Sequence, residues 1–272
     1  MKPILLATDY SPAARNAGDY AAQLALAGGT SLVVLHSWAP PAPMGETPVA
    51  VSITELEDIQ QSAVQSEADR LAKTWGVKTT AVQRMGFAAE EMQEYAKENN
   101  VELMVMGMHE TNTLGRLLGS VATASLHRME VPALIIPEGV KFHAPSTILL
   151  ATDLNTERDW NEIEELEQLS KLFNFDIHVI NVVREEQVTT AEESRSGIRL
   201  ENRMKDHPHT WHFPVDDNIL HAIGTTSDKV NADWIAVVPH HLPWYKDLFH
   251  SSVSRRIAFS TSRPLLALTG KS

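Results

Sequence analysis

A six-residue sequence occurs twice in this chain of 272 residues: Ile-Leu-Leu-Ala-Thr-Asp stands at 4–9 and again at 148–153. An identity of this length at such a distance indicates an internal repeat, and a repeat constrains the fold more than any other pattern does. A unit about half the chain long can bury its own core, so we interpret the repeat as a domain duplication and not as a solenoid. We therefore predict two similar domains, at residues 1–140 and 141–272.

Both halves alternate apolar runs with segments of helical periodicity. The first half has predicted strands at 3–8, 31–37, 78–83, 103–106 and 133–136, and predicted helices at 12–27, 54–75, 88–98 and from about 120. The second half has predicted strands at 147–152, 176–183, 234–238 and 264–268, a helix at 158–173 and a weaker helical pattern within 184–206. This alternation is typical of parallel sheets with right-handed crossovers. The predicted fold class is α/β, with two tandem doubly wound domains that each contain a five-stranded parallel sheet.

Composition excludes several classes of protein. The chain contains no cysteine, which rules out disulfides and thiolate chemistry. Its formal net charge of −12 argues against nucleic acid or an anionic membrane as the main partner. The sequence begins without a signal peptide pattern and contains no apolar run long enough to span a bilayer. We expect a soluble cytoplasmic protein.

A candidate site follows from the ends of the predicted strands. In an open parallel sheet, ligands bind beyond the carboxyl ends of the strands, where the strand order reverses. Asp9 follows the first strand and Gly107 ends the fourth. Gly119 and Ser120 then open a helix, whose free N–H groups and dipole favour an anion. These residues predict an anion site in the first half.

Four short segments together resemble the universal stress protein family: the ATD that ends the first strand, the VMG of the fourth strand, the LLGSV turn and the closing VPALIIP. Since the pattern occurs twice, the chain resembles a tandem member of that family. The resemblance implies a fold like that of the adenine-nucleotide alpha-hydrolases. Family members that bind ATP carry the motif G-x2-G-x9-G-[ST].

The resemblance implies a role for each matching residue in binding ATP or another adenine nucleotide. Asp9 would face the adenine, and the strand around Val34 would offer backbone contacts to the nucleoside. The phosphate loop would be formed by Gly107, His109, Gly119, Ser120 and Val121. Mg²⁺ would accompany a triphosphate.

Two departures from the motif weaken this expectation. Glu110 replaces the second glycine, and the loop from there to Gly119 is one residue shorter. A side chain and a negative charge beside a triphosphate cost binding through crowding and repulsion.

The second half departs further from the motif. Asp153 is retained, but Val238 and Pro239 stand where Gly107 is expected, and proline has no N–H to donate. His250 replaces Gly119, although Arg255 and its neighbouring arginine could hold a different anion. We expect no ATP site here, and a structural or partner-binding role instead.

Simpler explanations compete with each candidate. Asp9 and Asp153 could be turn residues, and Gly119-Ser120 could be an ordinary helix cap. The histidines at 207, 209 and 212, and those at 240, 241 and 250, could bind a divalent metal or form a polar strand edge, and we expect no metal site. No arrangement of catalytic residues is supported by the spacing.

Three function classes remain open. The leading prediction is a stress-response regulatory protein that binds an adenine nucleotide and is not an enzyme. One alternative is an interaction or scaffold module that binds no nucleotide, and another is a slow ATP hydrolase. The resemblance also implies that the fifth strands of the two halves lie edge to edge as an internal pseudo-dimer, within a monomer or a homodimer whose protein partners are unknown.

Overall fold

The computed structural model describes residues 2–40, 52–108, 131–154, 160–184, 191–238 and 263–269, without the side chains of residues 191 and 192. All structural statements concern these residues. Within them, no helix combines the length and apolar character required to cross a membrane.

The first half follows the predicted alternation. Its elements are β1 (Ile4–Ala7), α1 (Pro12–Ala27), β2 (Leu32–Trp38), α2 (Ile53–Trp75), β3 (Thr79–Met85), α3 (Ala88–Glu98), β4 (Leu103–Met108) and β5 (Ala133–Pro137). Local sequence determines the helix ends. Ser11 caps α1 by accepting a hydrogen bond from the Ala14 N–H, and Ser52 forms a reciprocal capping box with Glu55 at the start of α2. Gly76 ends α2 in the left-handed conformation.

The second half repeats the plan with shorter elements. They are β6 (Thr147–Ala151), α5 (Ile163–Phe173), β7 (Asp176–Ile180), α6 (Ala191–Met204), β8 (His209–His212), α7 (Ile219–Lys229), β9 (Trp234–Val237) and β10 (Leu265–Ala267). The weak helical pattern within 184–206 corresponds to α6. No element was predicted at the position of α7.

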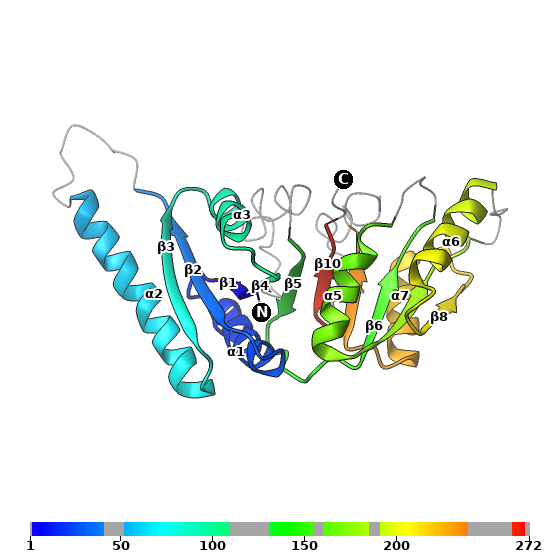
Figure 1. The fold of residues 1–272 in the computed structure, drawn as a ribbon, viewed down its shortest axis with the longest axis horizontal. Helices are drawn as coiled ribbons and strands as arrows, with labels where there is room; N and C mark the ends of the chain where they lie inside the picture. Colours follow the sequence, from blue (N-terminus) through cyan, green and yellow to red (C-terminus); the bar gives the residue numbers. More distant parts are fainter. Residues whose placement is uncertain are drawn as a thin grey trace.

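The ten strands form one sheet in the order β3-β2-β1-β4-β5-β10-β9-β6-β7-β8. Strands within each half are parallel, whereas β5 and β10 pair antiparallel, with Leu134 opposite Leu266. These two strands lie at the middle of the molecule, with the other strands of each half on either side (Figure 1). The predicted edge-to-edge pairing of the fifth strands is therefore confirmed.

Each face of the sheet carries one apolar core. One core joins side chains of α1, α2, α5 and α6, and the other joins side chains of α3 and α7. Corresponding helices of the two halves therefore lie on the same face. The β5–β10 seam, where the two halves meet, is antiparallel, and the halves place corresponding helices on the same face. Together these features imply a pseudo-twofold axis perpendicular to the sheet at the seam. The carboxyl ends of the two sets of strands therefore lie on opposite edges of the sheet.

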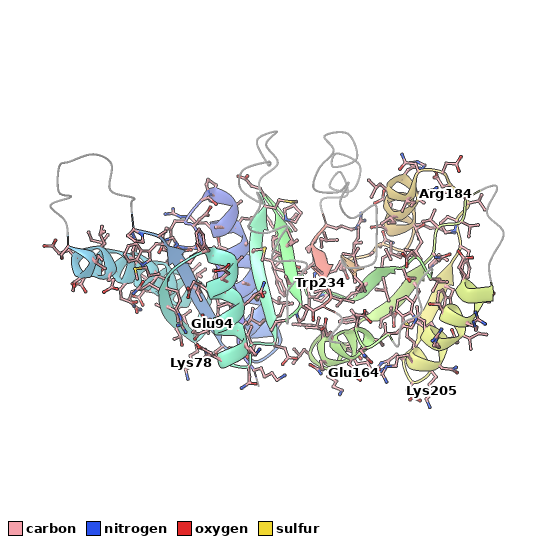
Figure 2. The ribbon with its side chains drawn as sticks, turned by 90° about the horizontal axis from the view of Figure 1, so that it is seen from above. Lys78, Glu94, Glu164, Arg184, Lys205 and Trp234 are labelled. Atoms are coloured by element: carbon pink, nitrogen blue, oxygen red, sulfur yellow. The ribbon has the colours of Figure 1, made fainter. Side chains whose placement is uncertain are left out.

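A buried hydrogen bond joins the halves beside this seam. Trp234 Nε1 donates to the Tyr20 hydroxyl at 2.8 Å, and both side chains are almost fully buried. Trp234 lies near the centre of the molecule, where the two halves meet (Figure 2). Burial raises the pKa of Tyr20 well above its ordinary value, so the phenol stays protonated.

Candidate functional site

A tight turn follows β1 and carries the candidate residue Asp9. Thr8 Oγ1 accepts a hydrogen bond from the Tyr10 N–H at 3.0 Å, and Asp9 Oδ1 accepts one from the Ser11 N–H at 3.0 Å. Tyr10 has a φ of 64°, the left-handed conformation that tight turns use. Asp9 is exposed, and none of the hydrogen bonds within the described part of the chain uses its Oδ2. The turn thus holds a carboxylate with one oxygen facing outward.

His36 supports this turn from β2. Its Nδ1 lies 2.7 Å from the Thr8 carbonyl oxygen, so Nδ1 must carry the hydrogen, and its ring lies 4.6 Å from that of Tyr10. Burial, with a smaller contribution from the Glu67 charge, raises the pKa of Tyr10 to about 12. His36 was not among the residues predicted from the sequence, although a polar residue near the end of an apolar strand is a usable signal.

The turn lies where the strand order reverses. The chain passes from β1 to β2 on one side and later returns to β4 on the other side of β1. Such a switch point opens a crevice at the carboxyl edge of a parallel sheet. Asp9 follows β1 at this carboxyl edge, and its role toward a ligand stays a prediction.

Gly107 does not end the fourth strand, which corrects the sequence prediction. It pairs with Ile136 inside β4, and the strand continues to Met108. A Cβ on Gly107 would lie 2.3 Å from the Ala13 carbonyl oxygen and 2.8 Å from the Ala14 nitrogen. Gly107 is therefore required for the close packing of α1 on the sheet, whatever its role toward a ligand.

Val34 lies within the sheet and away from its edge. It is fully buried and pairs with Leu6 on one side and Ala81 on the other. The residues of β2 nearest the carboxyl edge are His36, Ser37 and Trp38. The backbone that could contact a nucleoside is therefore further along β2 than the resemblance implied.

The remaining residues of the motif lie outside the described part of the chain. They are His109, Glu110, Gly119, Ser120 and Val121. Their role in a phosphate loop stays a prediction.

The turn of the first half is repeated in the second. Thr152 Oγ1 accepts a hydrogen bond from the Leu154 N–H at 3.4 Å, and Leu154 has a φ of 53°. Asn181 donates from Nδ2 to the Thr152 carbonyl oxygen at 3.1 Å. This bond corresponds to the one that His36 Nδ1 donates to the Thr8 carbonyl oxygen in the first half. The duplication therefore extends to individual hydrogen bonds, beyond the repeated sequence that contains Asp153.

The histidines near β8 point to different faces of the sheet. His209 contacts Glu201 of α6, whereas His212 contacts His178 through a 2.8 Å approach of Nε2 to Nδ1. Histidines 240, 241 and 250 lie outside the described residues. Among the residues that the structure describes, no three metal-binding side chains gather at one place.

Comparisons with known proteins agree with this geometry. The model of the universal stress protein family matches residues 1–137. Universal stress protein A homolog 1 of Coxiella burnetii is 32% identical over 129 residues, which cover 46% of this chain and 89% of that protein. A universal stress protein of Mycobacterium tuberculosis is 30% identical over 142 residues, but this chain spans only 44% of its length.

The similarity of fold extends over the whole chain. A universal stress protein structure from Archaeoglobus fulgidus superposes with a TM-score of 0.65 and 18% identity, and the match covers 98% of this chain and 96% of that one. A Pseudomonas aeruginosa structure described as a putative universal stress protein gives a TM-score of 0.54 at 13% identity, covering 99% and 93%. At these identities the structures support the fold alone. Together with the sequence matches, they show that this chain belongs to the universal stress protein family, as a member with two tandem copies of the fold.

Proposed function

We propose that this protein is a cytoplasmic regulatory protein whose first domain binds an adenine nucleotide at the carboxyl edge of β1 and β4. The domains are residues 1–140 and 141–272. The exposed carboxylate of Asp9, held at the switch point by its own turn, is the observation that carries the proposal. The protein acts through the conformation or partners that the bound nucleotide selects, without turnover of the nucleotide.

The chemistry of Asp9 fits an adenine base. Oδ1 is engaged by the Ser11 N–H, which fixes the orientation of the carboxylate. Oδ2 can then accept a hydrogen bond from the exocyclic amino group of adenine. The phosphates would extend toward the segment that follows β4, where Gly119, Ser120 and Val121 supply backbone N–H groups. Mg²⁺ would be needed only to offset the charge of a triphosphate near Glu110.

Titration calorimetry of the full-length protein with ATP and with AMP tests this proposal. Asp9→Asn keeps an oxygen for the turn but presents an NH₂ group in place of Oδ2, so it should weaken binding by about tenfold or more. Gly119→Val should weaken ATP more than AMP, because it crowds the phosphates. Asp153→Asn, the matched change in the second half, should have no effect. Equal affinity in wild type and in both first-half variants would refute the site.

An interaction module without a nucleotide is the second candidate. It is favoured by one observation: both Asp9 and Gly107 have structural roles that need no ligand, in the turn and in the packing of α1. Absence of any heat with ATP, ADP, AMP or cyclic AMP would favour this alternative.

A further inference from the structure

The second half contains a cavity of about 460 Å³ beneath α6, at the carboxyl ends of β7 and β8. This volume lies within the range of sites for small organic ligands. Its lining residues come from the turn after β6, from the strands and from one face of α6: Leu154, Asn181, Val183, Glu193, Ser194, Gly197, Ile198, Glu201, Asn202, Trp211 and Phe213.

Several residues that line the cavity differ in size from their counterparts in the first half. The strand registers align the halves, since Leu6 pairs with Val34 and Leu150 pairs with Val179. By this alignment three large side chains are replaced by smaller ones: Tyr10 by Leu154, His36 by Asn181 and Trp38 by Val183. On the neighbouring strand two small or polar side chains are replaced by aromatic ones, Ala81 by Trp211 and Gln83 by Phe213. The bulk is thus redistributed: the floor beside β6 and β7 is lowered, and the wall on β8 becomes aromatic.

Gly197 of α6 lines the cavity without a side chain that would reduce its volume. A Cβ at this position would meet Leu154 at 3.7 Å, which is an ordinary contact, so packing does not require glycine. Glycine inside a helix costs about 1 kcal/mol relative to alanine. A glycine that packing does not explain is consistent with space being kept for a ligand.

The walls offer aromatic and apolar surface. The rings of Trp211 and Phe213 lie parallel, with centroids 5.5 Å apart. Phe213 is 56% exposed and Ile198 is 62% exposed. Large apolar side chains that are left exposed around a concavity indicate a surface that a ligand covers.

A preorganised carboxylate lies beside these rings. Glu201 Oε2 accepts hydrogen bonds from Trp211 Nε1 at 2.7 Å and from His209 Nε2 at 3.0 Å. These bonds fix the side chain, and no hydrogen bond among the described residues uses Oε1. Glu193 is a second carboxylate in the lining, and the described lining contains no basic side chain.

We propose that this cavity binds a small organic cation, namely an amine that carries an aromatic or other apolar group. The apolar part lies against Trp211, Phe213 and Ile198, and the ammonium group donates to Glu201 Oε1. Aromatic rings combined with carboxylates favour ammonium groups through cation–π and charge-assisted contacts. None of the described residues that line this cavity belongs to the proposed nucleotide site of the first half.

Three probes with one ring system test the class of ligand: tryptamine, which is cationic, tryptophol, which is neutral, and indole-3-acetate, which is anionic. Calorimetry with the full-length protein at pH 7.5 should show binding of tryptamine, weaker binding of tryptophol and none of indole-3-acetate. Equal binding of all three, or no binding of tryptamine at millimolar concentration, would overturn the proposal.

Two variants locate the site. Glu201→Gln should weaken tryptamine by about tenfold or more, because it removes the charge that the ammonium contacts. Glu94→Gln removes the same charge from an exposed position on α3 in the other half (Figure 2) and should change nothing. Val183→Trp, which restores the bulk of Trp38, should abolish binding. Unchanged affinity in Glu201→Gln would place tryptamine elsewhere and refute the site, even if Val183→Trp fails to fold.

Discussion

Gly107→Ala should destabilise the protein severely, although it adds only a methyl group. The new Cβ would lie 2.3 Å from the Ala13 carbonyl oxygen and 2.5 Å from its carbonyl carbon. An ordinary contact begins at about 3.4 Å, so α1 would have to move by about 1 Å. The atoms in the way belong to the backbone, which has no rotamer to change. Overpacking in a well-packed core costs about 1–3 kcal/mol, and we expect a value of about 3 kcal/mol here.

The same substitution elsewhere provides the control. Gly197→Ala places a Cβ at an ordinary 3.7 Å from Leu154, inside a helix where alanine is favoured over glycine. This variant should be stabilised by up to about 1 kcal/mol. Alanine is intrinsically favoured over glycine inside both strands and helices. Intrinsic propensity therefore predicts the same sign for both substitutions and cannot account for opposite effects on stability.

Urea unfolding followed by circular dichroism measures both changes in the free energy of unfolding. The midpoint for Gly107→Ala should fall and that for Gly197→Ala should rise, with similar m-values. A Gly107→Ala protein within about 0.5 kcal/mol of wild type would refute the packing argument. The glycine would then be free to serve a ligand alone.

Further predictions concern the seam and the histidines. Tyr20→Phe leaves Trp234 Nε1 buried without its acceptor and should cost about 1–3 kcal/mol in urea unfolding, whereas adding Trp234→Phe should make the Tyr20 change nearly neutral. Burial, then the charges of His178 and Lys229, lowers the pKa of His212. The unfolded chain therefore binds more protons at this site, and stability should fall as the pH drops through the unfolded value near 6.5. His212→Asn should reduce the loss of stability between pH 7.5 and 5.5. His209→Asn should increase it, because burial lowers the pKa of His209 but hydrogen bonds to the His207 carbonyl and to Glu201 raise it overall. Equal pH dependence in both variants would contradict this assignment.

The repeated sequence was sufficient to predict the duplication of the fold, because apolar strands and capped helices are encoded locally. Ser11, Pro12 and Gly28 delimit α1 as predicted. Strand β4 was predicted, but its end was placed two residues too early because glycine was interpreted as a strand terminator, although the alternation of Met104, Met106 and Met108 continues through it. Glycine lies inside this strand because of a helix distant in sequence, and local patterns do not report such contacts.

Tertiary packing also explains what the sequence did not indicate. Helix α7 contains a glycine and two threonines, which have low helical propensity, yet Thr226 and Ser227 are buried within it. The cavity beneath α6 likewise depends on side chains from four separate segments. No local sequence pattern indicates that these segments meet around an open space.

The pseudo-twofold axis places the two proposed sites on opposite edges of one sheet. The nucleotide site lies at the carboxyl edge of β1 and β4, and the cavity lies at the carboxyl edge of β7 and β8, on the other side of the β5–β10 seam. None of the described residues that line the cavity belongs to the proposed nucleotide site, so coupling between them would pass through contacts between the halves. Beside that seam, Trp234 on β9 donates to Tyr20 on α1, the helix that begins just after Asp9. If the sites are coupled, Tyr20→Phe should reduce the effect of tryptamine on nucleotide affinity while leaving each separate affinity unchanged.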